Sequence, residues 1–135
     1  MSVAVTDSVI QSALALIPPM FGESWVVGRS GHGGDVSWVQ AVIPRGSVST
    51  PDHVLLFHRG VYVGTATEAP VPYTRVLDVA DDGITVEYRW IIGEEPSAAP
   101  AGVGTVRYLV SAQGVGPIDP PQWWSAAGLS GVVEG

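Results

Sequence analysis

The amino-acid sequence predicts an α+β fold in which an N-terminal helix packs on an antiparallel, mostly meandering β-sheet. Three observations predict this class. One apolar stripe with helical spacing lies near the start of the chain, at least five segments of alternating polarity follow it, and 17 glycines and 11 prolines occur among 135 residues. This density of turn residues suits short strands joined by tight turns better than a helical bundle.

The helix is expected over residues 6–17. Thr6 can cap its first turn through the side-chain oxygen, and Asp7 suits the positive end of the helix dipole. Apolar residues recur at three- and four-residue spacing and form one broad face, which comprises Val9, Ile10, Ala13, Leu14, Leu16 and Ile17. Two prolines follow and end the helix, because the residue before a proline avoids the helical region. Such a face is typical of a helix packed on a sheet.

The next segments change to a two-residue period. Residues 24–28 predict a strand, residues 30–34 a flexible glycine-rich loop, and residues 36–43 a central strand that is buried on both faces. Residues 53–58 and 61–64 are apolar runs on either side of an Arg-Gly step, which predicts a β-hairpin.

The second half continues the strand pattern. Residues 74–79 predict a strand, residues 81–83 a tight turn, and residues 84–90 the clearest alternation in the chain. Residues 105–110 are expected to form the last strand, and the composition beyond Gly114 shifts to a tail rich in proline, glycine and tryptophan. We expect one core that contains Phe57, Tyr88, Trp90 and Tyr108, with Trp25 and Trp38 buried in their strands.

Charge and composition exclude several partners. The formal net charge is −7, and all six basic residues are dispersed arginines. Nucleic acid is therefore not an expected ligand, because its affinity comes mainly from clustered basic residues that contact phosphates. No apolar run approaches the roughly 18 residues that span a bilayer, so no membrane insertion is expected. The first twenty residues lack the positively charged start of a signal peptide and contain Asp7.

No constellation of residues predicts catalysis, a cofactor or a metal. His53 and His58 are five residues apart on a predicted strand and should point to opposite faces, and His32 lies in the glycine-rich stretch. That stretch, residues 28–34, precedes a strand pattern, whereas a phosphate-binding loop precedes a helix. The acidic pairs at residues 81–82 and 94–95 are best explained as solvated turns. We therefore expect a protein that is not an enzyme.

The C-terminal tail is the predicted partner-binding element. Trp123 and Trp124 are adjacent, so an extended segment cannot bury both, and tryptophan is enriched at contact hot spots. Together with Leu129 they are the candidate partner-binding residues. The alternative is that the tail folds back over an open sheet edge.

Residues 53–110 contain the segments LLFHRGVYVGTAT, DDGITVEYRW and GVGTVRY, and these resemble the LppP/LprE family of actinobacterial lipoproteins. The resemblance extends over residues 24–120 through SWVVG, DVSWVQAVI and PIDP. It implies a cell-envelope protein, and its motifs are those of a fold rather than of a catalytic site. The chain departs from the family in having no cysteine, where cysteines are expected near Asp35 and in residues 96–100, and no lipid-attachment site. A cytoplasmic or particle-bound location therefore remains open beside the cell envelope.

The resulting functional hypothesis is a non-catalytic binding or accessory module that acts through a protein partner or self-assembly. The alternative is a structural component of a larger assembly, such as a virion decoration or tail protein of an actinobacterial phage. The expected organisation is a helix and linker over residues 1–22, a β-rich family-like domain over 23–120, and a tryptophan-rich tail over 121–135. No small-molecule ligand can be named from the residues.

Overall fold

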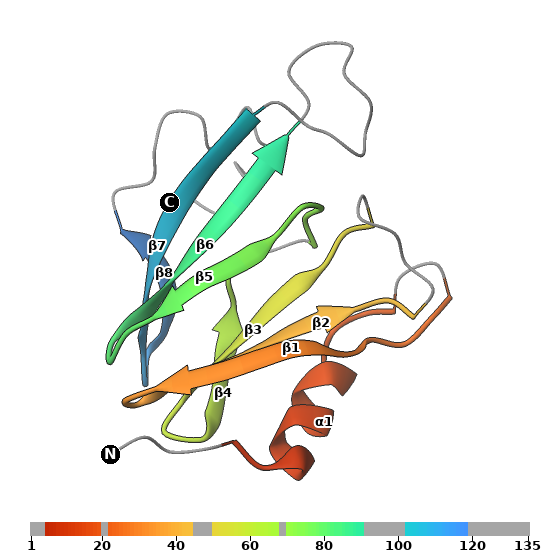
Figure 1. The fold of residues 1–135 in the computed structure, drawn as a ribbon. Coiled ribbons are helices and arrows are strands. Elements are labelled where there is room, and N and C mark those ends of the chain that lie inside the picture. Colours follow the sequence, from red (N-terminus) through yellow and green to blue (C-terminus); the bar gives the residue numbers. More distant parts are fainter. Residues whose placement is uncertain (1–4, 20–21, 45–49, 68–69, 91–101, 119–135) are drawn as a thin grey trace.

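The computed structural model describes residues 5–19, 22–44, 50–67, 70–90 and 102–118. Within these ranges the chain forms one short helix and eight strands (Figure 1). In chain order they are α1 (Asp7–Ala15), β1 (Val26–Gly33), β2 (Val36–Val42), β3 (His53–His58), β4 (Val61–Thr65), β5 (Arg75–Val79), β6 (Gly83–Trp90), β7 (Gly102–Ser111) and β8 (Gly114–Ile118).

The strands form two antiparallel sheets, each a four-stranded meander. The first has the order β1-β2-β3-β4 and the second has the order β5-β6-β7-β8. The predicted antiparallel meander is therefore confirmed, but the prediction of a single sheet is wrong. The fold is also richer in β-structure than the predicted α+β class, since one nine-residue helix accompanies eight strands in the described part.

The predicted hairpin at residues 53–64 is present as β3 and β4. Arg59 and Gly60 form its turn with φ values of 50° and 80°. Positive φ at both central residues is the requirement of a type I′ turn, whose twist matches that of the flanking strands.

The central strands of the first sheet carry apolar residues on both faces, which explains the run Val54–Phe57 in β3 and the consecutive apolar residues in β2. Alternate side chains of these strands belong to different hydrophobic clusters. Val54 and Leu56 face the second sheet, whereas Leu55 and Phe57 belong to the cluster on the other face. A strand buried on both sides needs apolar residues at every position rather than at every second one.

The main core lies between the two sheets. It combines Val36, Val54 and Leu56 of the first sheet with residues of β6 and β7, which are Ile84, Val86, Tyr88, Val106, Tyr108 and Val110. The hydroxyl groups of Tyr88 and Tyr108 lie 2.7 Å apart in this core and share a hydrogen bond. Burial raises the pKa of both phenols, so the pair remains protonated and can hydrogen-bond at physiological pH.

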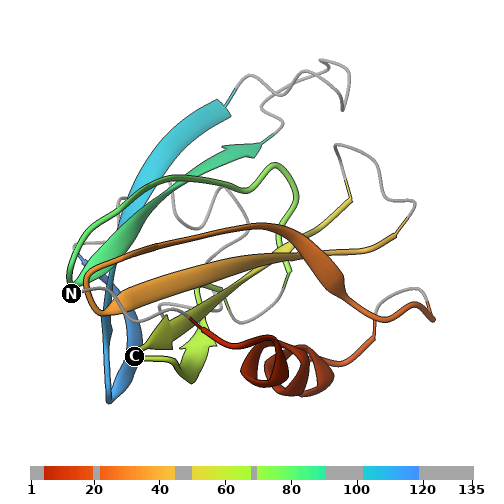
Figure 2. The same ribbon diagram turned by 60° about the horizontal axis from the view of Figure 1, so that its bottom comes forward.

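The second cluster contains residues of α1 and of the first sheet. Its buried members are Ala13, Leu14, Ile17, Trp25, Val39, Ala41, Ile43, Leu55 and Phe57, and Figures 1 and 2 show α1 beside the β1–β4 sheet. Thr6 caps the helix as predicted, since its Oγ1 accepts a hydrogen bond from the amide of Val9 at 3.3 Å. The predicted packing of α1 across the sheet stays a prediction, which the Leu14 variant described in the Discussion tests.

The prediction of one aromatic core is wrong in part. Tyr88 and Tyr108 share the core between the sheets, whereas Phe57 lies in the second cluster. Trp90 ends β6 half-buried and belongs to neither cluster. Its indole lies over Gly102, where a Cβ atom would collide with the ring. Trp90 therefore covers a glycine on the neighbouring strand instead of filling the core.

Two strands lie where the sequence predicted a loop and a tail. The glycine-rich stretch at residues 30–34 is largely part of β1, whose Gly31 pairs with Trp38. A Cβ at Gly31 would lie 2.7 Å from the Trp38 indole nitrogen, so glycine here makes room for the ring. Beyond Gly114 the chain forms β8, an edge strand that accommodates Pro117 because one of its sides needs no hydrogen-bond donor.

The two sheets also contact each other along their edges. At one side Gly33 of β1 meets Val79 of β5, and a Cβ on this glycine would lie 3.3 Å from Val79 Cγ1. At the other side Gly64 of β4 meets Val115 of β8, with a corresponding distance of 3.6 Å. No helix in the described ranges is both long and apolar enough to cross a membrane.

Candidate functional site

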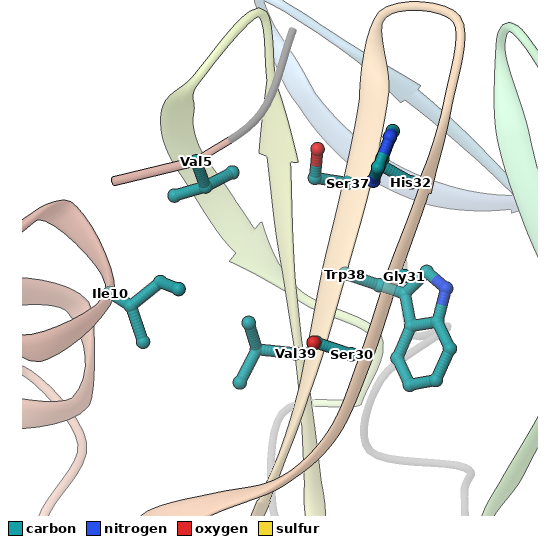
Figure 3. A pocket seen from close by; sticks show the side chains of 8 residues that line it. All are labelled: Val5, Ile10, Ser30, Gly31, His32, Ser37, Trp38 and Val39. Carbon is teal, nitrogen blue, oxygen red and sulfur yellow. The ribbon is translucent and has the colours of Figure 1, made fainter. Parts of the chain in front are cut away.

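A hollow between α1 and the β1–β2 hairpin is the candidate ligand site. It has a volume of about 410 Å³ and is called here the helix-side hollow. Its lining residues come from three segments and are Val5, Ile10, Ser30, Gly31, His32, Ser37, Trp38 and Val39 (Figure 3). Ligand pockets for small molecules typically measure roughly 300–1,000 Å³, so the size is sufficient for a small organic molecule.

The apolar wall of the helix-side hollow comes from the helix segment and from β2. Val5 and Ile10 are half-buried, and Val39 is buried in the cluster beneath them. Figure 3 shows these three side chains pointing toward a common space, with the Trp38 indole on the other side of the hairpin. This wall can accept an apolar group of a ligand.

The polar wall of the same hollow comes from the hairpin. Register pairs Ser30 with Val39 and His32 with Ser37, so strand alternation places these side chains on the helix side of the sheet. Ser30 and His32 are exposed, whereas Ser37 is buried. A hydroxyl and an imidazole offer both donors and acceptors of hydrogen bonds. The hollow as a whole is therefore amphipathic.

The three histidines lie in different surroundings. His32 lines the helix-side hollow, whereas His53 is buried beside Trp25 with ring centroids 5.5 Å apart. His53 and His58 lie on opposite faces of β3, as predicted, since the alternating neighbours belong to different clusters. Burial lowers the pKa of His53 to about 4, and its Nδ1 atom has no hydrogen-bond partner among the described residues. In the described ranges no three potential metal ligands gather in one place.

The acidic turn at residues 81–82 has a structural role. Asp82 Oδ1 accepts a hydrogen bond from Arg107 Nη2 at 3.2 Å, and its backbone carbonyl accepts one from the amide of Val110 at 2.8 Å. Gly83 follows it because a Cβ there would collide with the backbone oxygen of Tyr108. The other acidic pair, at residues 94–95, lies outside the described residues.

The predicted partner-binding residues Trp123, Trp124 and Leu129 also lie outside the described residues. The sequence did not predict the helix-side hollow as a site. Its serines and apolar residues are of common types without a motif, and they come from segments that only the fold brings together. Among the lining residues, the sequence suggests a ligand role only through His32 as a metal ligand and through the glycine-rich stretch as a phosphate-binding loop, and it favours neither.

Comparison with known proteins places the chain in a family. The sequence profile of the LppP/LprE lipoprotein family matches residues 30–113, which is more than half of the chain. The chain belongs to this family, as its hairpin and strand motifs indicated. The matched range begins within β1 and ends at the turn between β7 and β8, so it includes seven of the eight described strands wholly or in part.

The relatives include mycobacterial proteins that carry the name lipoprotein LppP. Those of Mycobacterium bovis and Mycobacterium tuberculosis are each 37% identical to this chain over 112 residues. The alignment covers 81% of this chain and 64% of each relative, so the chain spans about two-thirds of their length or slightly less. No solved structure matches the chain.

Proposed function

We propose that this chain is a non-catalytic binding module of the LppP/LprE family that takes an amphipathic small molecule in the helix-side hollow. The observation that carries the proposal is the hollow itself. It has the volume of a ligand site, and both apolar and polar side chains line it. The apolar part of the ligand lies against Val5, Ile10 and Val39, and its polar part reaches Ser30 and His32.

The cell envelope is the proposed place of action. The mycobacterial relatives are named as lipoproteins, and the family description carries the same word. A binding module of this kind fits the envelope because amphipathic molecules are abundant in its lipid layers. The proposal for location therefore rests on the relatives.

Binding of a neutral apolar fluorophore tests the proposed site. N-phenyl-1-naphthylamine carries no charge, so its binding reports the apolar wall and not the arginines of the protein. We expect saturable fluorescence enhancement with the wild-type chain. The variant Ile10→Glu should weaken binding by about tenfold or more, because a carboxylate in the wall would have to be desolvated by the probe.

The matched control is Ser12→Glu, which adds the same charge at an exposed position of the same helix. It should bind the fluorophore as the wild type does. Circular dichroism of both variants shows whether the fold is retained. Equal affinity of the two glutamate variants would remove the helix-side hollow as the binding site, as would a wild-type chain that shows no saturation.

The predicted protein partner stays a prediction beside this proposal. Trp123, Trp124 and Leu129 remain its candidate residues, and self-assembly remains one form that it could take. The deletion described in the Discussion tests that prediction separately from ligand binding.

A further inference from the structure

A second hollow opens where the edges of the two sheets diverge. It has a volume of about 380 Å³, and its lining residues are Gly28, Arg29, Gln40, Val42, Thr74 and Arg75. Strands β1 and β5 are in contact at Gly33 and Val79, near their carboxyl ends, and Figure 1 shows them separating toward their amino ends. We call this space the sheet-edge hollow.

The arginines at the sheet-edge hollow differ from the other arginines of the described part of the chain in their ion pairing. Arg59, Arg89 and Arg107 each form an ion pair, with Asp35, Glu87 and Asp82 respectively, at 3.0–3.2 Å. Arg29 and Arg75 form no ion pair within the described ranges, and both line this hollow. Glu87 lies opposite Arg75 on β6, but it pairs with Arg89. The two unpaired cations therefore lie together in a chain whose net charge is −7.

Gln40 and Thr74, two lining residues of the sheet-edge hollow, are held by hydrogen bonds. Gln40 of β2 donates from Nε2 to the carbonyl of Thr74 at 2.9 Å and to Asp52 Oδ2 at 3.0 Å. Thr74 in turn donates from Oγ1 to the carbonyl of Val71 at 2.8 Å. These bonds attach the segment before β5 to the first sheet, so the base of Arg75 has a fixed position relative to β1.

Arg29 owes its position to an irregularity in β1. The register with β2 shifts between Val27 and Arg29, so Gly28 is an extra residue opposite the neighbouring strand. Such bulges bend a strand and redirect the side chain that follows. A Cβ at Gly28 would lie 2.8 Å from Val42 Cγ1, so glycine also allows the strands to approach closely at this point.

We infer that the sheet-edge hollow binds an oxyanion, the carboxylate or phosphate group of a small soluble molecule, between Arg29 and Arg75. Both guanidinium groups are exposed and can reach a ligand from solvent. Each presents planar N–H donors that match the two oxygens of a carboxylate or phosphate. The Asp52 carboxylate, which would repel an anion, is bound to Gln40 and is not among the lining residues. This site is separate from the helix-side hollow and does not depend on the function proposed there.

Titration with two simple anions tests this inference. Inorganic phosphate and succinate are added separately to the full chain at low ionic strength, and amide chemical shifts are followed by NMR. We expect saturable shifts around residues 28–29 and 74–75 for at least one anion. The anion that binds with the higher affinity shows whether the hollow prefers a phosphate or a carboxylate group. Arg29→Gln and Arg75→Gln should each weaken that binding by about tenfold, since each removes charge-assisted hydrogen bonds.

Arg107→Gln is the matched control, because it removes the same charge from an arginine that already has a partner on an exposed face. Its affinity should stay within about twofold of the wild type. An equal loss in all three variants would overturn the inference, because it would show only attraction to net charge. Absence of saturable shifts with both anions would also overturn it. A rise of the wild-type melting temperature with the preferred anion gives a second readout. It should be lost in Arg29→Gln and in Arg75→Gln, so either variant alone is sufficient if the other fails to fold.

Discussion

Asp52 and His53 are neighbours at the start of β3, and burial favours the neutral form of both. Burial raises the pKa of Asp52, although its hydrogen bond from Gln40 acts in the opposite direction. Burial lowers the pKa of His53 from 6.5 to about 4. Since these pKa values differ from those of the unfolded chain, each residue makes the stability depend on pH, and the two do so with opposite signs.

His53 should cause a loss of stability in mild acid. Above pH 6.5 the imidazole is neutral in both states, whereas between pH 6.5 and about 4 only the unfolded chain takes up the proton. The shift corresponds to about 3 kcal/mol of unfolding free energy lost across this range. In His53→Phe this part of the pH dependence should be absent when urea denaturation is compared at pH 7.5 and pH 4.5.

The test compares how much the free energy of unfolding of each chain changes between the two pH values. The stability at pH 7.5 alone is no test, because it also contains any effect of the larger phenylalanine ring on packing. Asp52 acts oppositely, since its raised pKa adds stability as the pH falls toward its ordinary value of 3.8. The comparison of two chains that both keep Asp52 cancels this contribution. Identical pH dependence of wild type and variant would show that His53 titrates normally.

At the scale of elements, the ends of α1 are set by neighbouring residues, whereas its stability depends on packing against distant ones. Its start at Asp7 follows from Thr6, and its C-terminal end follows from the two prolines beyond Ile17. Its buried residues include Leu14, which is 6% exposed, whereas Leu16 on the other side is 71% exposed. Isolated helices of nine residues are marginal in water, so α1 depends on the contacts of its apolar face.

Leu14→Ala should lower the free energy of unfolding by about 2–4 kcal/mol, because it removes a buried side chain from the second cluster. Leu16→Ala makes the same chemical change two residues later at an exposed position and should alter stability by about 0.5 kcal/mol or less. Chemical denaturation of both variants measures the difference. Similar small values for the two would mean that α1 does not pack on the sheet.

At the scale of the whole molecule, two meanders protect each other's edges. β1 contacts β5, and β4 contacts β8, so the edge strands of one sheet lie beside those of the other. Among the described residues, no helix or strand packs on the outer face of the second sheet. This face carries the exposed side chains of Val103, Leu109 and Ile118.

Deleting residues 121–135 should leave the domain folded and abolish its self-association, if the tail is the docking element that the sequence predicts. Burial of Trp123 or Trp124 in another copy would contribute on the order of a few kcal/mol. Sedimentation velocity at increasing concentration, together with thermal denaturation, measures both effects. A deleted chain that unfolds or aggregates would instead support the alternative that the tail covers an open sheet edge. A full chain that stays monomeric at every concentration would contradict self-association through the tail.

Local patterns in the sequence determined most elements of the fold. The Thr6 cap, the Arg59-Gly60 turn and the alternation from Ile84 to Trp90 depend on residues a few positions apart, and each is present. The same local reasoning failed for β1 and β8. Glycine and proline usually mark loops, but here Gly31 makes room for Trp38, and Pro117 lies on an edge strand.

Only the tertiary structure decided which faces meet. Alternation shows that neighbouring side chains point to opposite sides of a strand, but it does not say what covers each side. The separation of Phe57 from Tyr88, the helix-side hollow, and the shared hollow of Arg29 and Arg75 therefore could not be predicted from the sequence. The two arginines are 46 positions apart in the chain (75 − 29), and their common hollow exists because two sheet edges contact at one end and diverge at the other.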